Sequence, residues 1–391
     1  MKVVDLRNVF ASCNDQLIEI SDNLIYYAEE KNEEGHNSLF LLEYNRITKR
    51  ERILTNYILD KPAFVQHFFS FPEVILLVLE DGGSSVEILS IDKLTGEERS
   101  AVALSLVGSF SDCAALDENR LILFTEEDEA HEELFSEYRR LTGFARVALL
   151  FDLEEEAYYY LRDPRVCNAA ARDLVTYDLD GDPQLLVLQP HGDEQEKLNC
   201  YKNMRWLGDN VNDNVWLCPL FDFIVSAKAG EKRVPLELIL SAGTTGLVRY
   251  AGMNGEDLYF RVKYFPTNDQ RLCAVNTRTN KRRIVAQLNL EAGDRDVFFC
   301  IDTDGGRAYK IADRGDCFEA AGVLNSNLHA RYSKELGDFI TCVEDRFIVA
   351  KYVLADETDS FEFNSIYDCQ TGEQQSYECS CAAKGGTVVL Y

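Results

Sequence analysis

Apolar residues in this chain gather in short runs, and polar turn residues separate one run from the next. The stretch 86–98, VEILSIDKLTGEE, shows the pattern: an apolar run, a polar corner at 95–97 and the start of a return run. Such runs, bounded by Gly, Asn, Asp and Ser, are typical of antiparallel strands. The pattern therefore predicts a mainly β protein built from short meanders.

The same phrase recurs along the chain, most clearly as FNSIYDCQTGE at 363–373. Weaker copies cover 39–50, 146–156 and 271–281. The polar residues that close the third predicted strand of each copy are Asn45, Asp92, Asp152, Asn276 and Asp368. The last two steps between these residues are about twice the first two, so each should contain one degenerate copy, for which Phe221-Asp222 and 307–313 are candidates. The count of copies is then seven.

Repeated four-stranded units of this length are typical of β-propellers, in which each blade buries its apolar faces against its neighbours. The sequence therefore predicts an all-β, seven-bladed β-propeller that forms a single domain over 1–391. Six or eight blades are also compatible with the weak copies. The terminal stretches 2–6 and 387–391 are apolar enough to join an end blade.

The corners at Asp92–Glu97 and Asp368–Glu373 share the pattern Asp-x-x-Thr-Gly-Glu. With these corners the chain resembles the propeller superfamily of PQQ-like and WD-repeat-like arrays. The resemblance implies a fold and no activity, because the Trp-Asp signature of WD repeats is missing. The two tryptophans, Trp206 and Trp216, do not precede an aspartate.

An insertion at 125–142 interrupts the third copy. Leu134, Phe135 and Tyr138 fall on one stripe of a predicted amphipathic helix. Thr125 is a candidate for its N-terminal cap, and the basic pair at 139–140 suits its C-terminal end. Two interpretations stay open: the helix covers its own apolar surface as a lid over one face of the propeller, or the stripe contacts a partner.

The fourth copy, about 170–242, is long and irregular. It contains DLDGD at 178–182, which resembles the calcium loop of FG-GAP and VCBS-type repeats and implies Asp178, Asp180 and Asp182 as ligands. Pro183 replaces the next glycine and a closing carboxylate is missing, so an ordinary hairpin turn is the alternative interpretation. The polar stretch 189–214 carries Trp206. Calcium is the one cofactor that the sequence suggests.

The formal net charge is −27, from 40 Lys and Arg against 67 Asp and Glu. Such a charge argues against a nucleic-acid or anionic-membrane partner, and it favours high solubility or a cationic partner. The start of the chain lacks the continuous apolar run of a signal peptide. Twelve cysteines without a C-x-x-C pair are typical of buried thiols in a reducing compartment, which indicates a cytoplasmic protein.

Motifs of known catalytic families are missing: the five histidines form no H-E-x-x-H pair, and G-x-S-x-G and P-loop patterns do not occur. The leading hypothesis is a non-catalytic scaffold that binds a protein through the loop face carrying 125–142 and 189–214. Its contact residues would be Leu134, Phe135, Tyr138 and Trp206. The alternative is small-molecule binding, or a hydrolase-like activity, at the central funnel of the propeller.

Overall fold

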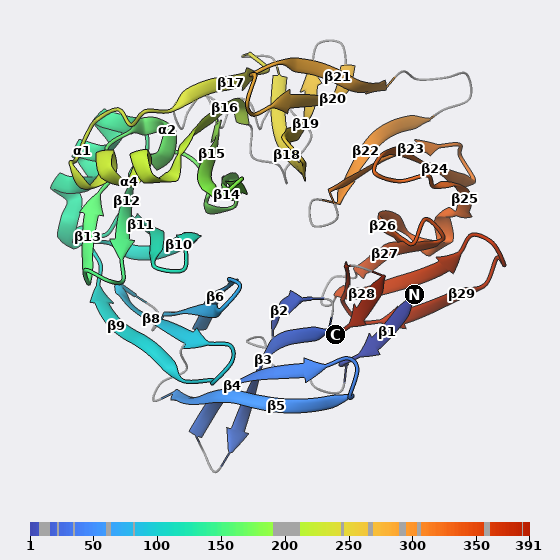
Figure 1. The fold of residues 1–391 in the computed structure, drawn as a ribbon, viewed down its shortest axis with the longest axis horizontal. Coiled ribbons are helices and arrows are strands. Elements are labelled where there is room, and N and C mark those ends of the chain that lie inside the picture. Colours follow the sequence, from blue (N-terminus) through green and yellow to red (C-terminus); the bar gives the residue numbers. More distant parts are fainter. Residues whose placement is uncertain are drawn as a thin grey trace. The chain divides into compact units, whose positions relative to one another are not determined.

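The computed structural model describes residues 1–7, 16–21, 23–33, 36–59, 64–80, 83–190, 212–243, 246–264, 269–288, 295–302, 306–355, 360–384 and 386–391. Within them the chain forms eight β-sheets and a few short helices (Figure 1). The chain divides into two compact units. The N-terminal unit comprises Ser12–Glu19 and Asn23–Val248, and the C-terminal unit comprises Met1–Ala11, Ile20–Asp22 and Arg249–Tyr391.

The N-terminal unit contains four antiparallel four-stranded sheets, each a meander of consecutive strands. Their strands are β2 (Gln16–Ile20), β3 (Leu24–Glu33), β4 (His36–Asn45) and β5 (Arg50–Leu59); β6 (Phe64–Ser70), β7 (Val74–Glu80), β8 (Ser85–Asp92) and β9 (Glu98–Ser105); β10 (Ser109–Asp117), β11 (Arg120–Glu126), β12 (Arg146–Asp152) and β13 (Ala157–Tyr160); and β14 (Leu174–Leu179), β15 (Asp182–Pro190), β16 (Asn212–Pro219) and β17 (Glu237–Ser241).

The C-terminal unit contains three further four-stranded sheets and one three-stranded sheet. Their strands are β18 (Gly246–Asn254), β19 (Asp257–Tyr264), β20 (Asp269–Asn276) and β21 (Arg282–Leu288); β22 (Asp296–Asp302), β23 (Arg307–Asp313), β24 (Cys317–Leu324) and β25 (His329–Ser333); β26 (Asp338–Val343), β27 (Phe347–Ala355), β28 (Ser360–Asp368) and β29 (Gln374–Glu378); and β30 (Cys381–Lys384), β31 (Thr387–Leu390) and β1 (Lys2–Asp5).

The fold is a mainly β propeller of eight blades, so the predicted number of seven is wrong. The seven four-stranded sheets correspond to the seven copies of the phrase. The eighth sheet combines both ends of the chain: β1 pairs in parallel with β31, with Lys2 opposite Thr387, and β31 pairs with β30. Because its strands come from the two ends of the sequence, this blade does not contain the repeated sequence pattern, and counting the copies therefore missed it.

The predicted corners are confirmed, since Asn45, Asp92, Asp152, Asn276 and Asp368 end β4, β8, β12, β20 and β28. At the second of them, Asp92 Oδ1 accepts hydrogen bonds from the backbone N–H groups of Leu94 (2.9 Å) and Thr95 (2.8 Å). Arg99 also donates to this carboxylate. The Thr95 amide and then the Arg99 guanidinium lower the pKa of Asp92 to about 2. The acid of the phrase therefore holds its own turn together.

The insertion in the third blade contains a 3-10 turn, η1 (Glu129–His131), followed by helix α1 (Glu132–Thr142). The predicted helix is confirmed, although Thr125 is not its cap, because Thr125 lies in β11. Asp128 caps η1 by accepting a hydrogen bond from His131 N, and His131 is the N-cap of α1, without a side-chain cap. Gly143 ends α1 in the left-handed conformation. The other helical segments among the described residues are α2 (Pro164–Cys167), η2 (Ala171–Asp173), α4 (Leu220–Lys228) and η3 (Lys334–Leu336).

Helix α4 was not predicted. The sequence placed the end of a strand at Phe221-Asp222, but β16 already ends at Pro219 and α4 joins it to β17. Its inner face is buried with Phe223 and Ile224, in the same apolar cluster as β6 to β15. Among the described residues, no helix is both long enough and apolar enough to cross a membrane.

Candidate functional site

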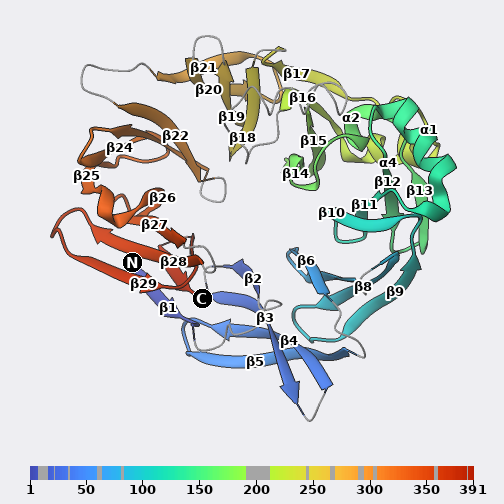
Figure 2. The ribbon, with the colours of Figure 1, turned by 180° about the vertical axis from the view of Figure 1, so that it is seen from behind.

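The first strands of three successive blades in the N-terminal unit lie side by side. Strand β10 contacts β6 on one side and β14 on the other. Both ribbon views show β6, β10 and β14 along one edge of their sheets, with the fourth strands β9, β13 and β17 along the opposite edge (Figure 1 and Figure 2). Residues that are distant in sequence therefore meet on one wall.

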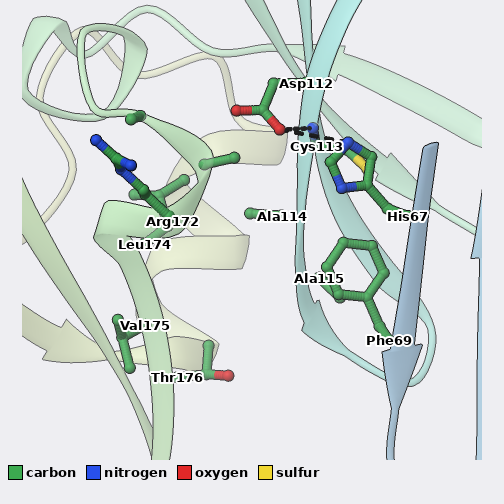
Figure 3. Close-up of a pocket in the computed structure, with 12 residues that line it drawn as sticks. His67, Phe69, Asp112, Cys113, Ala114, Ala115, Arg172, Leu174, Val175 and Thr176 are labelled. Atoms are coloured by element: carbon green, nitrogen blue, oxygen red, sulfur yellow. Dashed lines mark hydrogen bonds and ion pairs between the residues drawn. The ribbon is translucent and has the colours of Figure 1, made fainter. Parts of the chain in front are cut away.

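A cavity of about 650 Å³ opens between these strands (Figure 3). It is lined by His67 and Phe69 of β6, by Asp112, Cys113, Ala114 and Ala115 of β10, and by Ala170, Ala171, Arg172, Leu174, Val175 and Thr176 at η2 and the start of β14. Pockets for small molecules typically measure about 300–1,000 Å³, with mostly apolar walls and a few polar groups. The composition of this wall matches that description.

Two of the polar residues follow β-bulges. The register of β6 against β7 shifts between Val65 and His67, and that of β10 against β11 shifts between Phe110 and Asp112. A bulge inserts one extra residue and re-aims the side chains beside it, and bulges are over-represented next to functional sites. His67 and Asp112 are each the fourth residue of their strand, so the same local device presents both at equivalent positions of adjacent blades.

The imidazole of His67 lies against the carboxylate of Asp112, with 3.4 Å between Nε2 and Oδ1 (Figure 3). Oδ1 of Asp112 also accepts a hydrogen bond from Cys113 N at 2.9 Å. The ring of His67 stacks on Phe69 at 6.0 Å between centroids and meets the edge of Phe110 at 6.3 Å. Burial lowers the pKa of His67, and the Asp112 charge only partly offsets this. Burial therefore favours the uncharged form of this imidazole.

Arg146, at the start of β12, is a partly buried cation whose charge interacts with that of Asp112. Its guanidinium donates to the carbonyl of Ala169 at 2.9 Å and lies 3.8 Å from the centre of the Phe124 ring. Burial lowers the pKa of Arg146, while the charges of Asp112 and Glu126 act in the opposite direction.

Arg172 is different. It belongs to η2, its side chain is exposed, and within the described part of the chain it has no hydrogen bond or ion pair. It lines the cavity on the side of β14, across from His67 (Figure 3). The wall therefore offers an imidazole whose uncharged form burial favours, a carboxylate that lies against it, and a guanidinium that is available to an anionic group.

The cavity lies toward the end of the sheets that carries the predicted insertions. Asp112 pairs with Phe124, close to where β11 leads into η1 and α1. Leu174 pairs with Val187, close to the end of β15. Residues 191–211 follow there, and they lie outside the described residues.

The structure describes three of the four predicted partner-contact residues. Phe135 is 0% exposed and Tyr138 is 3% exposed, and the hydroxyl of Tyr138 donates to the carbonyl of Leu161 at 2.7 Å. Leu134 is partly buried against the same core. The stripe of α1 thus faces inward, which favours the interpretation that the helix covers its own apolar surface. Trp206 lies outside the described residues.

The suggested calcium ligands lie on a hairpin turn. Asp178 is on β14, Asp182 begins β15, and Asp180 and Gly181 form the turn between them with positive φ angles of 54° and 86°. Gly181 N donates to Asp178 Oδ1 at 2.7 Å, and Asp182 accepts from Gln184. The hairpin is confirmed; calcium stays a prediction. Over the ranges that the structure describes, no group of three or more His, Cys, Asp or Glu is arranged to hold a metal ion.

Sequence reasoning did not single out His67, Asp112 or Arg172, because each is an ordinary residue in its own segment. The signal that could have found the first two is their shared position in the first strand of consecutive copies. No comparable signal marks Arg172, which precedes its strand in a short 3-10 turn.

No protein-family model matches the chain, and no curated protein matches it. Solved structures do. An uncharacterized protein of Listeria monocytogenes has a TM-score of 0.49 at 11% identity, over 96% of each chain. Oligogalacturonate lyase of Vibrio parahaemolyticus has a TM-score of 0.43 at 11% identity, over 86% of this chain and 85% of its own. The β-propeller domain of the Trilobed protease of Pyrococcus furiosus has a TM-score of 0.43 at 12% identity, over 93% and 96%.

This chain is a β-propeller with distant structural neighbours only. At 11–12% identity the likeness extends to the fold and no further. The propeller fold supports many unrelated functions, so function has to be argued from the site.

Proposed function

We propose that this propeller binds a small organic molecule in the cavity between β6, β10 and β14. The observation that carries the proposal is the wall itself: about 650 Å³ lined mostly by apolar side chains, with His67, Asp112 and Arg172 among its polar groups. A cavity built only for packing would have been filled by larger side chains, because protein interiors are close-packed. Here alanines occupy four of the lining positions.

Binding of a protein partner through the loop face, the other function suggested by the sequence, has less support. Its two aromatic contacts on α1 are buried, and Trp206 lies outside the described residues. Partner binding therefore stays a prediction without a described contact surface, while the cavity offers named side chains.

The proposal is tested by screening a library of metabolites and fragments against the pure protein with ligand-observed NMR and thermal shift. A ligand at 100 times its dissociation constant stabilises a fold by about 2.7 kcal/mol. Hits should be lost in Ala115→Trp, in which an indole fills the cavity. The matched control is Ala103→Trp, because Ala103 is an exposed strand residue on β9 away from the cavity.

Two outcomes would overturn the proposal. One is a screen without hits. The other is a set of hits that bind Ala115→Trp as well as they bind the natural sequence, which would place their site elsewhere.

A further inference from the structure

The cavity wall has an unequal charge balance. Its lining includes one carboxylate, Asp112, one imidazole, His67, and one guanidinium, Arg172. Asp112 lies 3.4 Å from Nε2 of His67 and accepts a hydrogen bond from Cys113 N. Among the described residues nothing pairs with Arg172. The lining charge without a partner among the described residues is therefore the positive charge of Arg172.

We infer that the ligand of this cavity is a small organic anion, whose acidic group binds Arg172 and whose hydrogen-bond donor meets the imidazole of His67. This inference rests on the proposed function and names its ligand class. A guanidinium recognises carboxylate and phosphate groups through paired N–H donors, and such hydrogen bonds are stronger than those between neutral groups.

The imidazole defines the second contact. Asp112 faces Nε2, and a carboxylate there favours the tautomer with its proton on Nε2. Nδ1 then carries the lone pair, and Figure 3 shows this second ring nitrogen on the side of the ring that faces β14. A hydroxyl or N–H group of the ligand is the complementary donor.

The remaining wall selects for an organic skeleton. Phe69, Leu174 and Val175 border the cavity together with four alanines, so an inorganic ion would leave most of this surface exposed to water. Burying apolar surface contributes roughly 25 cal/mol per Å². The ligand should therefore carry a ring or a short aliphatic chain beside its acidic group.

The preference for anions has to come from the cavity itself and not from the charge of the whole chain. A net charge of −27 gives anions no general attraction to the protein. Exposed charges that lie more than about 8 Å from the ligand are largely screened at physiological salt. The guanidinium of Arg172, next to the ligand, therefore determines the preference for anions. Loss of that single guanidinium should abolish the preference for anions.

The test uses three hydroxycarboxylates, namely 3-hydroxybenzoate, 4-hydroxyphenylacetate and 6-hydroxy-2-naphthoate, each with its matched amide and amidine. We expect the acids to bind at least tenfold more tightly than their amides, and the amidines to bind most weakly, by ligand-observed NMR or calorimetry. Arg172→Gln should weaken the acids about tenfold or more, as expected for loss of a hydrogen bond to a charged group, and should leave the amides unchanged. Arg172→Lys keeps the charge and should retain part of the affinity.

The matched control is Arg162→Gln. Arg162 is also exposed and has no hydrogen bond or ion pair among the described residues, but it does not line the cavity. Binding of amides or amidines equal to that of the acids would overturn the inference and leave small-molecule binding intact. Equal loss in both arginine variants would also overturn it. If no compound of any charge binds here and the library screen is also empty, the proposed function itself fails.

Discussion

Helix α1 and the cavity wall differ in how their visibility in the sequence relates to their exposure in the structure. The stripe of α1 is conspicuous in the sequence, and yet Phe135 and Tyr138 are buried. His67 and Arg172 are inconspicuous in the sequence, and yet both line an open cavity. A strong local pattern here marks a segment that has to pack, whereas the candidate site combines single residues from three blades.

The physical reason is that packing is satisfied within one element, whereas a site between blades is assembled from several. An amphipathic stripe satisfies a local requirement, because the residues that form it lie within one helix. A site between blades needs only one or two residues from each strand, so no strand has to carry a motif. The comparison therefore predicts that α1 substitutions change stability and that cavity substitutions change binding.

The largest expected effect is at α1. Phe135→Ala removes a fully buried ring and should lower the free energy of unfolding by about 3–5 kcal/mol, measured by urea denaturation. Glu133→Ala, on the exposed side of the same helix, should change it by about 0.5 kcal/mol or less. If both variants were equally stable and only Phe135→Ala lost a protein partner, the stripe would be a contact surface after all.

The corners extend the comparison to a second strong pattern. A Cβ at Gly96 (φ 77°) would lie 2.1 Å from the carbonyl oxygen of Leu54, whereas a Cβ at Gly372 (φ 75°) would meet nothing within 4 Å. Gly96→Ala should therefore cost about 3 kcal/mol or more, from the strained φ together with the clash, and Gly372→Ala about 1 kcal/mol from φ alone. Equal losses in thermal or urea unfolding would mean that the corner at Gly96 can move away from Leu54.

These corners also show how far the sequence could lead. Asp92 and Asp368 accept hydrogen bonds from residues two and three positions ahead, so the four shared residues of one six-residue pattern predicted both turns. The pairing of β1 with β31 joins opposite ends of the chain, and no local pattern encodes it. Between the third and fourth strands of the fourth blade, helix α4 stands where the repeat pattern predicts a short turn. The apolar face of α4 packs against the core there.

The candidate site could not be predicted from local sequence patterns either, because its residues come from segments that are distant in sequence. The sequence alternative of a small-molecule site named the funnel without residues, since the contact between His67 and Asp112 depends on how two blades pack. Their shared position after a bulge becomes visible only when the register of β6 and β10 is known.

The smallest expected effect concerns the titration of His67. Its pKa in the folded protein is lowered, mainly by burial, from the ordinary value near 6.5. The unfolded chain then binds the proton more readily, so the stability contribution is complete above about pH 6.5 and declines as pH falls toward the lowered pKa. The decline cannot exceed about 1.4 kcal/mol per pH unit for one proton.

His67→Gln isolates this contribution from the many carboxylates of the chain. The difference in unfolding free energy between the natural sequence and His67→Gln should be constant above pH 6.5 and should shift against the natural sequence below it. Asp112→Asn should lower the pKa of His67 further, because it removes the opposing charge. With five histidines in the chain, imidazole NMR can follow the ring directly, using His67→Gln for assignment. A His67 pKa at or above 6.5 would mean that the ring is more hydrated than the structure shows, and the wall would then present a cationic imidazole beside Arg172.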